Sequence, residues 1–329
     1  MLFPVEKNEK YGYCNEDGEI VIPLDFDYGD EFEGGMAFVE KDGLCGFINN
    51  HGEYIINPEY DDINYFNEGL AMFKSQSKCG YLDNEGRIVV PAMFEDGLGF
   101  NGGLAAVKHQ GKWGYINTSG EFAIEPVYDE ACDFGESNMA VVTKDDRFGF
   151  VDKNGKSVSG FIFDYAGDFN NGLAAVGLNG KNLYVNEDFN TIIEGDFDFI
   201  NDFQEGLAAV SKDDQWGFVD TKGNIIVPLK YNWTDSFDGG YAPVCIDDRY
   251  GFVNSLGKEV IPCEYDNVLN YSEGLFSVEI DGKWGFVNEE NRIVIKPAFE
   301  EVENFSEGFA KVILEDRESY INKSGIIIY

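Results

Sequence analysis

The feature that most constrains this chain is a unit that repeats from one end to the other with a period of about 34 residues. Each copy carries a slot, in most copies a glycine between two aromatic residues, and successive slots are evenly spaced except for one step that is longer by a single residue. The slot falls at Gly12, Gly46, Gly80, Gly114, Gly149, Leu183, Gly217, Gly251, Gly285 and Ser319. Repetition at a period of about 20–50 residues is typical of solenoids and propellers. Because ten copies leave no room for a separate domain, we expect residues 1–329 to form one array, with nine full copies and a partial tenth.

The pattern inside one unit indicates β-strands. In the fourth copy, residues 104–109, 112–117 and 122–124 are short runs rich in aliphatic and aromatic residues, and glycine-containing turns separate them. Such runs are typical of strands in a meander, and no stretch shows a sustained helical period. The sequence therefore predicts an all-β chain of about ten three-stranded units.

Two aromatic slots and one small slot recur beside the glycine. One aromatic follows the proline region, as at Tyr128, and a second lies six residues later, as at Phe134. The small slot holds alanine in most copies, as at Ala105 and Ala140. One unit cannot bury such a face alone, so we interpret these residues as core packing between neighbouring units.

Two ladders of charge also follow the repeat. A carboxylate comes just after the first aromatic, and a basic residue comes just before the tryptophan slot. The first ladder is Asp27, Asp61, Glu95, Asp129, Asp164, Asp198, Asp266 and Glu300, and the second is Lys10, Lys78, Lys112, Arg147, Lys181, Arg249, Lys283 and Arg317. A feature needed for stacking should recur in nearly every unit, so we favour turn bonding and ion pairs between strands or units over a charged track for a partner.

The triplets Trp113-Gly114-Tyr115, Trp216-Gly217-Phe218 and Trp284-Gly285-Phe286 resemble the WG-repeat family of bacterial proteins. The resemblance covers essentially the whole chain. It implies an all-β repeat protein that binds rather than catalyses, and it supplies no catalytic residues. The chain departs from the pattern in the tryptophan slot, which holds Tyr11, Cys45, Cys79, Phe148, Asn182, Tyr250 and Glu318. Copies around residues 155–200 are degenerate, because two of them also lack the proline.

Two architectures fit these units. We favour an open, curved or superhelical array, because the unit is shorter than the familiar four-stranded blade of about 40–45 residues. Ten blades would also exceed the usual four to eight. The alternative is a large β-propeller.

Composition limits the possible partners. The chain has 24 Lys and Arg against 61 Asp and Glu, a net charge of −37, so we expect no binding to nucleic acid or to anionic membranes. A protein partner, a basic one in particular, suits such a surface. The start of the chain does not resemble a signal peptide, and Cys45 and Cys79 occupy the same slot of successive copies, beyond disulfide reach. We therefore expect a cytoplasmic protein with reduced cysteines.

Signatures of catalysis and of metal binding are missing from the sequence. The two histidines, His51 and His109, have no metal-ligand spacing, and there is no phosphate-binding loop or nucleophile elbow. We expect no cofactor, no metal and no enzyme activity. A hydrolase with paired carboxylates is the least favoured alternative, because carboxylates are too abundant here for any pair to be informative.

One slot breaks the repeat in the middle of the chain. It lies one residue beyond the acidic ladder and is polar in most outer copies, but it holds Tyr165, Phe199 and Trp233 in three consecutive copies. Aligned copies would present these rings as a stripe suited to a peptide, a glycan or a cationic group. The other interpretation is local repacking in degenerate copies. We predict a scaffold for protein–protein interaction with an extended acidic surface, and keep glycan or small cationic ligand binding on the stripe as the alternative.

Overall fold

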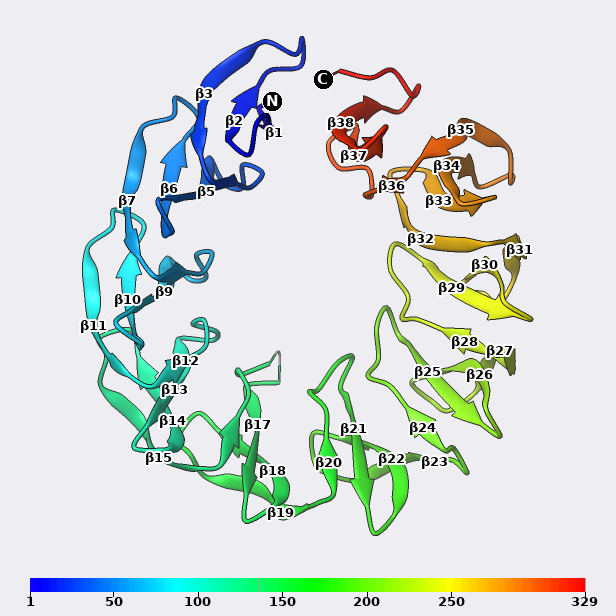
Figure 1. Cartoon of the computed structure of the whole chain (residues 1–329). Coiled ribbons are helices and arrows are strands. Elements are labelled where there is room, and N and C mark those ends of the chain that lie inside the picture. The colour runs from blue at the N-terminus through cyan, green and yellow to red at the C-terminus, as the bar shows by residue number, and fades with distance from the viewer. Residues whose placement is uncertain (136, 329) are drawn as a thin grey trace. The chain divides into compact units, whose positions relative to one another are not determined.

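The computed structural model describes residues 1–135 and 137–328, and its only long regular elements there are β-strands. The chain divides into two compact units, Met1–Ala166 and Gly167–Tyr329, and each is considered by itself. Within each unit, small antiparallel sheets follow one another along the chain (Figure 1).

The first unit holds twenty strands. They are β1 (Phe3–Glu6), β2 (Tyr11–Cys14), β3 (Ile20–Phe26), β4 (Tyr28–Gly29), β5 (Met36–Lys41), β6 (Leu44–Asn49), β7 (Tyr54–Tyr60), β8 (Asp62–Ile63), β9 (Leu70–Ser75), β10 (Lys78–Asp83), β11 (Ile88–Phe94), β12 (Asp96–Gly97), β13 (Leu104–His109), β14 (Lys112–Asn117), β15 (Phe122–Tyr128), β16 (Glu130–Ala131), β17 (Met139–Lys144), β18 (Arg147–Asp152), β19 (Ser157–Phe163) and β20 (Tyr165–Ala166).

The second unit continues the same order of strands. They are β21 (Leu173–Leu178), β22 (Lys181–Asn186), β23 (Thr191–Glu194), β24 (Phe199–Ile200), β25 (Leu207–Lys212), β26 (Gln215–Asp220), β27 (Ile225–Tyr231), β28 (Trp233–Thr234), β29 (Tyr241–Ile246), β30 (Arg249–Asn254), β31 (Glu259–Tyr265), β32 (Asn267–Ser272), β33 (Leu275–Ile280), β34 (Lys283–Asn288), β35 (Ile293–Phe299), β36 (Glu301–Val302), β37 (Phe309–Leu314) and β38 (Arg317–Asn322).

Four strands, not three, make up a typical sheet, which corrects the three-stranded unit expected from the sequence. In the order β12-β13-β14-β15, the two residues of β12 pair with β13 through Asp96↔Lys108 and Gly97↔Val107. The sequence reading missed this strand because a single residue separates it from the preceding seven-residue strand. The all-β array with the predicted period is confirmed. Its four-stranded sheets support the large β-propeller, which was the alternative to an open array of three-stranded units.

The recurring glycine is required by a close approach of two strands. A Cβ atom on Gly114 would lie 2.6 Å from the backbone oxygen of Ile124 and 2.7 Å from the nitrogen of Pro126. The pairing of β14 with β15 shifts register across Gly114, with Trp113 opposite Tyr128 and Tyr115 opposite Ile124, and shifts again between Tyr115 and Ile116. The glycine therefore lies at an irregularity of the strand pairing where the facing backbone approaches too closely for a side chain.

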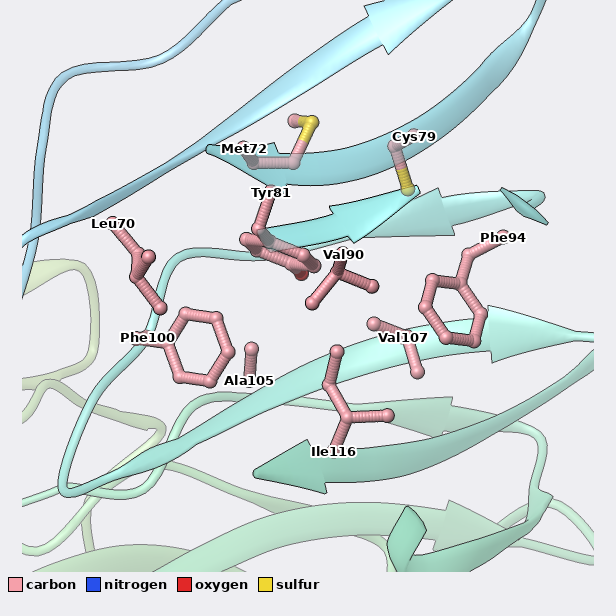
Figure 2. Close-up of a cluster of buried hydrophobic side chains, with 10 residues drawn as sticks. All are labelled: Leu70, Met72, Cys79, Tyr81, Val90, Phe94, Phe100, Ala105, Val107 and Ile116. Atoms are coloured by element: carbon pink, nitrogen blue, oxygen red, sulfur yellow. The ribbon is translucent and has the colours of Figure 1, made fainter. Parts of the chain in front are cut away.

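The core lies between consecutive sheets. Figure 2 shows one such layer, in which Tyr81 of β10 and Phe100, just before β13, face each other with ring centroids 4.9 Å apart. Ala105 is completely buried in the same cluster, at the small slot. Within each unit, consecutive sheets thus bury aromatic faces against each other, as the repeated slots predicted.

The degenerate copies behave differently from each other. Strand β19 keeps its full seven residues although its copy lacks the proline. Strand β23 stops after four residues, where the equivalent strands in most other copies have seven. Regular sheet geometry is therefore reduced in the copy that contains β23, and the consequences are described below.

Candidate functional site

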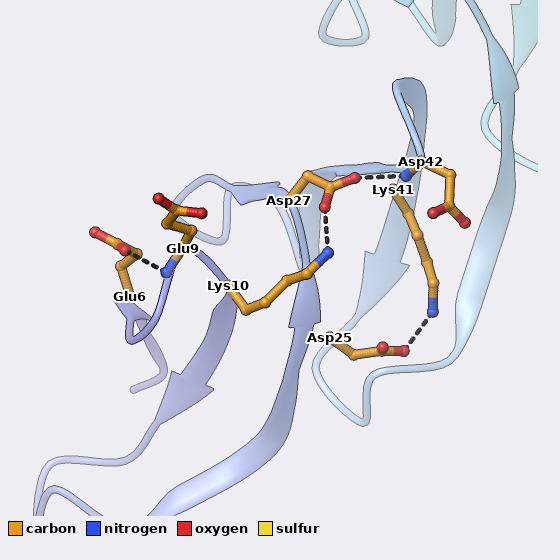
Figure 3. Close-up of polar contacts among 7 residues, drawn as sticks. All are labelled: Glu6, Glu9, Lys10, Asp25, Asp27, Lys41 and Asp42. Carbon is orange, nitrogen blue, oxygen red and sulfur yellow. Dashed lines mark hydrogen bonds and ion pairs between the residues drawn. The ribbon is translucent and has the colours of Figure 1, made fainter.

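The acidic ladder and the basic ladder tie strands together. In the first copy, Figure 3 shows the Lys10 amine paired with the Asp27 carboxylate, which also accepts a hydrogen bond of 2.5 Å from the backbone N–H of Asp42. The hydrogen bond from Lys10 holds the pKa of Asp27 below its usual value. Asp27 therefore links one sheet to the β5–β6 turn of the next sheet.

Most copies repeat this arrangement. Basic and acidic ladder residues form the ion pairs Lys112–Asp129, Arg147–Asp164, Arg249–Asp266 and Lys283–Glu300. Ladder oxygens accept turn N–H groups in the pairs Gln76–Asp61, Gly111–Glu95, Asp145–Asp129, Asp213–Asp198, Asp247–Asn232, Asp281–Asp266 and Glu315–Glu300. For these residues the structural interpretation of the ladders is confirmed, because their side chains are engaged within the protein.

A further ladder was missed by sequence reasoning. The two carboxylate oxygens of Glu68 accept N–H bonds of 2.9 and 2.8 Å from Gly102 and Gly103 of the next copy. Equivalent bonds join Asn171 to Gly206, Glu205 to Gly240 and Glu273 to Gly308. A polar residue directly before a glycine, recurring at the same place in many copies, was the signal that could have revealed it.

One edge of the sheets is acidic and lacks basic residues. The edge is formed by the short first strand and the segment after it, and Figure 1 draws these segments on the side of each unit opposite β7, β11, β27 and β31. Each segment except 98–103 contains Asp or Glu, and not one contains Lys or Arg. The segments, called here the edge segments, are 30–35, 64–69, 98–103, 132–138, 167–172, 201–206, 235–240, 269–274 and 303–308, with residue 136 outside the described part.

Two carboxyl groups of neighbouring edge segments influence each other. Burial, and secondarily the charge of Asp168, raises the pKa of Asp202 to about 6. Burial also raises the pKa of Asp168. The Asp202 carboxylate packs directly on Gly167, and its Oδ1 lies 2.2 Å from where a Cβ of residue 167 would be. Of the two groups, Asp202 therefore changes its charge under mildly acidic conditions.

The residues of the predicted aromatic stripe fall into both units. Tyr165 lies in β20 at the end of the first unit and is half-buried, whereas Phe199 and Trp233 begin β24 and β28 of the second unit. Phe199 pairs with Ser211 and Trp233 with Cys245, so the two rings occupy equivalent positions in successive sheets. The stripe as a binding site stays a prediction.

Both rings of the second unit are exposed and rest on an aromatic side chain of their own sheet. Phe199 is 60% exposed and stacks on Trp216 with ring centroids 6.3 Å apart and planes at 20°. Trp233 is 43% exposed and meets Tyr250 at 5.9 Å. Ser211 and Cys245, opposite the two rings in the strand pairing, are buried. The arrangement leaves aromatic faces open to solvent on a supported base.

A surface hollow is lined in part by Phe197, two residues before Phe199 in the chain. It has a volume of about 380 Å³ and is lined by residues 180–182 and 194–197. A smaller one of about 100 Å³, at residues 301–303, 311–313 and Glu318, is crossed by ion pairs of Lys311 with Glu303 and Glu318. Across residues 1–135 and 137–328, no cluster of His, Cys, Asp and Glu is arranged to hold a metal ion, and no helix could span a membrane.

The comparison with known families agrees with the repeat seen in the sheets. The family described as "WG containing repeat" matches at residues 11–45, 46–79, 80–113, 113–147, 148–181, 184–216, 216–250, 250–284 and 284–317. The chain belongs to the WG-repeat family. The nine matches meet or abut except between residues 181 and 184, where Asn182 and Leu183 replace the Trp-Gly pair of this WG-repeat protein.

A solved structure resembles the WG-repeat protein in fold. The crystal structure titled "the eukaryotic initiation factor" aligns with a TM-score of 0.55 at 10% identity, over 100% of this chain and 95% of that chain. BamB from Moraxella catarrhalis aligns with a TM-score of 0.40 at 11% identity, over 92% of this chain and 95% of that chain. No curated protein matches the sequence. At these identities the likeness concerns the fold alone.

Proposed function

We propose that this WG-repeat protein is a non-enzymatic scaffold that mediates protein–protein interaction through an extended acidic surface. The observation that carries the proposal is the charge of the edge segments, which contain acidic residues and no lysine or arginine. The ladder carboxylates are engaged in ion pairs and turn bonds, and some edge carboxylates, such as Glu68 and Glu273, are bonded too, but edge residues such as Glu33, Asp238 and Glu307 remain exposed. Repeat arrays commonly present such long surfaces to a protein partner.

Electrostatics supports a basic protein as the partner. Like-signed groups along one edge produce a field that attracts positive charge, raises the association rate and weakens with added salt. Interacting surfaces of this kind depend on ionic strength because the Debye length is about 8 Å at physiological salt. We therefore expect complexes of this protein to form rapidly and to dissociate in high salt.

The test is a pull-down from the native cytoplasm with the full chain as bait. The matched bait carries Glu33→Gln, Asp238→Asn and Glu307→Gln, three exposed edge-segment residues whose replacement keeps side-chain size. Retention of a protein by the first bait, and clearly weaker retention by the second, supports the proposal. Retention of no macromolecule, together with turnover of a small molecule, contradicts it.

A further inference from the structure

The copy that contains β22 and β23 has lost both residues of the Trp-Gly pair. Asn182 stands where Trp113, Trp216 and Trp284 stand in other copies, and Leu183 replaces the glycine. At Gly114 and Gly217 the facing strand comes within 2.6 and 2.4 Å of where a Cβ would be. The leucine side chain excludes that approach, so β23 ends at Glu194, directly opposite Leu183.

Loss of the large side chain and of the last part of the strand leaves the hollow of about 380 Å³. Its lining consists of residues 180–182 on one side and residues 194–197 on the other. The side-chain amide of Asn182 reaches across the hollow. It donates hydrogen bonds to two backbone oxygens, that of Phe197 at 3.1 Å and that of Asp198 at 2.7 Å. Asn182 thus joins the two sides where other copies have a tryptophan, and the ion pair of Lys181 with Glu194 joins them a second time.

An exposed aromatic ring, that of Phe199, follows the last lining residue by two positions in the sequence. Phe199 follows Phe197 by two positions, which corresponds to about 7 Å along an extended chain. Its ring is 60% exposed and is held nearly parallel to Trp216. A flat, supported ring beside a hollow suits a flat cation, because a guanidinium group stacks on aromatic faces.

The carboxylates in the lining favour the same ligand. Glu194 and Asp196 are exposed, and each is paired through one oxygen only, Oε1 with Lys181 and Oδ2 with Lys212. A carboxylate has a second oxygen that can accept from a guanidinium fork, and exposed lysine pairs of this kind are weak. Among the described residues, the nearby turn residues Asp213 and Asp214 form no salt bridge.

We propose that the hollow at Asn182, with the Phe199 ring beside it, binds an arginine side chain of a partner protein. This assignment rests on the proposed scaffold function and names the chemistry that the partner must present. Arginine fits better than lysine because only its planar fork can stack on Phe199 while it bonds a carboxylate.

The experiment measures binding of three fluorescent dodecapeptides to the full chain at about 0.15 M salt. They share one Gly/Ser sequence with three arginines, three lysines or three citrullines, the last being neutral but nearly isosteric with arginine. We expect the arginine peptide to bind best and the citrulline peptide to lose binding. Asn182→Trp refills the hollow with the residue of other copies, and it should weaken the arginine peptide at least about tenfold, as should Phe199→Ala.

The matched control is Tyr28→Ala. Tyr28 is 42% exposed in the slot equivalent to Phe199, but its preceding copy has Tyr11 and a full seven-residue strand β3. This variant should leave binding unchanged. If Asn182→Trp fails to fold, Phe199→Ala and Asp196→Asn carry the test.

Equal binding of the citrulline peptide, or binding that none of the site variants alters, overturns the assignment. Binding of an oligosaccharide to the intact chain that Asn182→Trp abolishes, with no arginine-peptide binding, also overturns it in favour of a glycan site. A partner protein retained equally by the intact chain and by Asn182→Trp overturns the arginine site but leaves the scaffold function standing.

Discussion

The hydroxyl of Tyr115 donates a hydrogen bond of 2.8 Å to the backbone oxygen of Cys132, which lies in the next sheet along the chain. The tyrosines in equivalent slots do the same, from Tyr13 to Asp30 at 2.8 Å and from Tyr184 to Asn201 at 2.7 Å. Burial raises the pKa of Tyr13 above its ordinary value, which keeps the hydroxyl protonated as a donor. The bond therefore connects neighbouring sheets by a polar contact within an apolar layer.

Tyr115→Phe should lower the free energy of unfolding by about 0.5–1.5 kcal/mol, the usual contribution of one hydrogen bond, with the carbonyl of Cys132 left short of a donor. Urea denaturation followed by tryptophan fluorescence measures the change. Tyr54→Phe removes a hydroxyl from an exposed ring and serves as the control, with little expected change. An equal loss in both variants would show that the hydroxyl of Tyr115 contributes nothing specific.

Gly114→Ala should destabilise the fold by about 2–3 kcal/mol, because its Cβ would press on the backbone of Ile124 to Pro126, which cannot move without breaking strand pairing. Gly135→Ala is the matched control. Gly135 has no atom near the position of an added Cβ and is not in the left-handed region. The melting temperatures of both variants provide the measurement. If Gly114→Ala melts at the same temperature as the unchanged chain, the close approach is not the reason for the glycine.

Trp233→Ala should change stability by less than about 1 kcal/mol, because much of the ring is exposed and surface substitutions are usually mild. Trp284→Ala, by contrast, removes a ring that is only 8% exposed and should cost about 3–5 kcal/mol. Melting temperatures of the two variants are to be compared. A similar loss in both would make Trp233 a core residue and remove it from the predicted stripe.

Asp202 should make stability fall as the pH rises. Its pKa in the folded protein, about 6, lies above the unfolded value of about 3.9, so the folded state holds the extra proton between these values. This stabilisation is present in full below pH 4 and is lost as the pH rises through 6. With allowance for partial exposure, the loss is about 1–2 kcal/mol.

Asp202→Asn isolates this effect from the other carboxyl groups, many of which titrate in the opposite sense. The difference in unfolding free energy between Asp202→Asn and the unchanged chain should grow from pH 4 to pH 7 in favour of the variant. Chemical denaturation at four pH values across this range provides the measurement. A constant difference would mean that Asp202 has an ordinary pKa.

Repeated positions were predictable from the sequence because the same physical demand acts in every copy. The glycine at Gly114, the small slot at Ala105 and the ladder carboxylate at Asp27 each recur, and each turned out to serve contact between strands or sheets. The two-residue strand β12 was missed because strands that short carry no alternation in the sequence. The bonds from Glu68 to Gly102 and Gly103 were missed because they join copies that the sequence cannot place side by side.

The candidate site shows the same division. The sequence marked Phe199 and Trp233 as departures from the repeat, and it marked Asn182 as a lost tryptophan. It did not show that Asn182, Leu183 and the early end of β23 act together to open a hollow lined by Glu194 to Phe197. That consequence depends on how closely a neighbouring strand can approach a residue without a side chain, which is a property of three-dimensional packing.

By itself, the sequence determined the period, the all-β class, the family and the side chains that form the core, because a repeated local pattern specifies repeated local structure. The tertiary structure decided the four-stranded form of the sheets, the partners of the charge ladders and the location of the hollow. These depend on contacts between residues 15–35 positions apart, such as Asp27 with Asp42 and Gly206 with Asn171. Such contacts form only after sheets pack, since packing brings donors and acceptors from different copies within hydrogen-bonding distance.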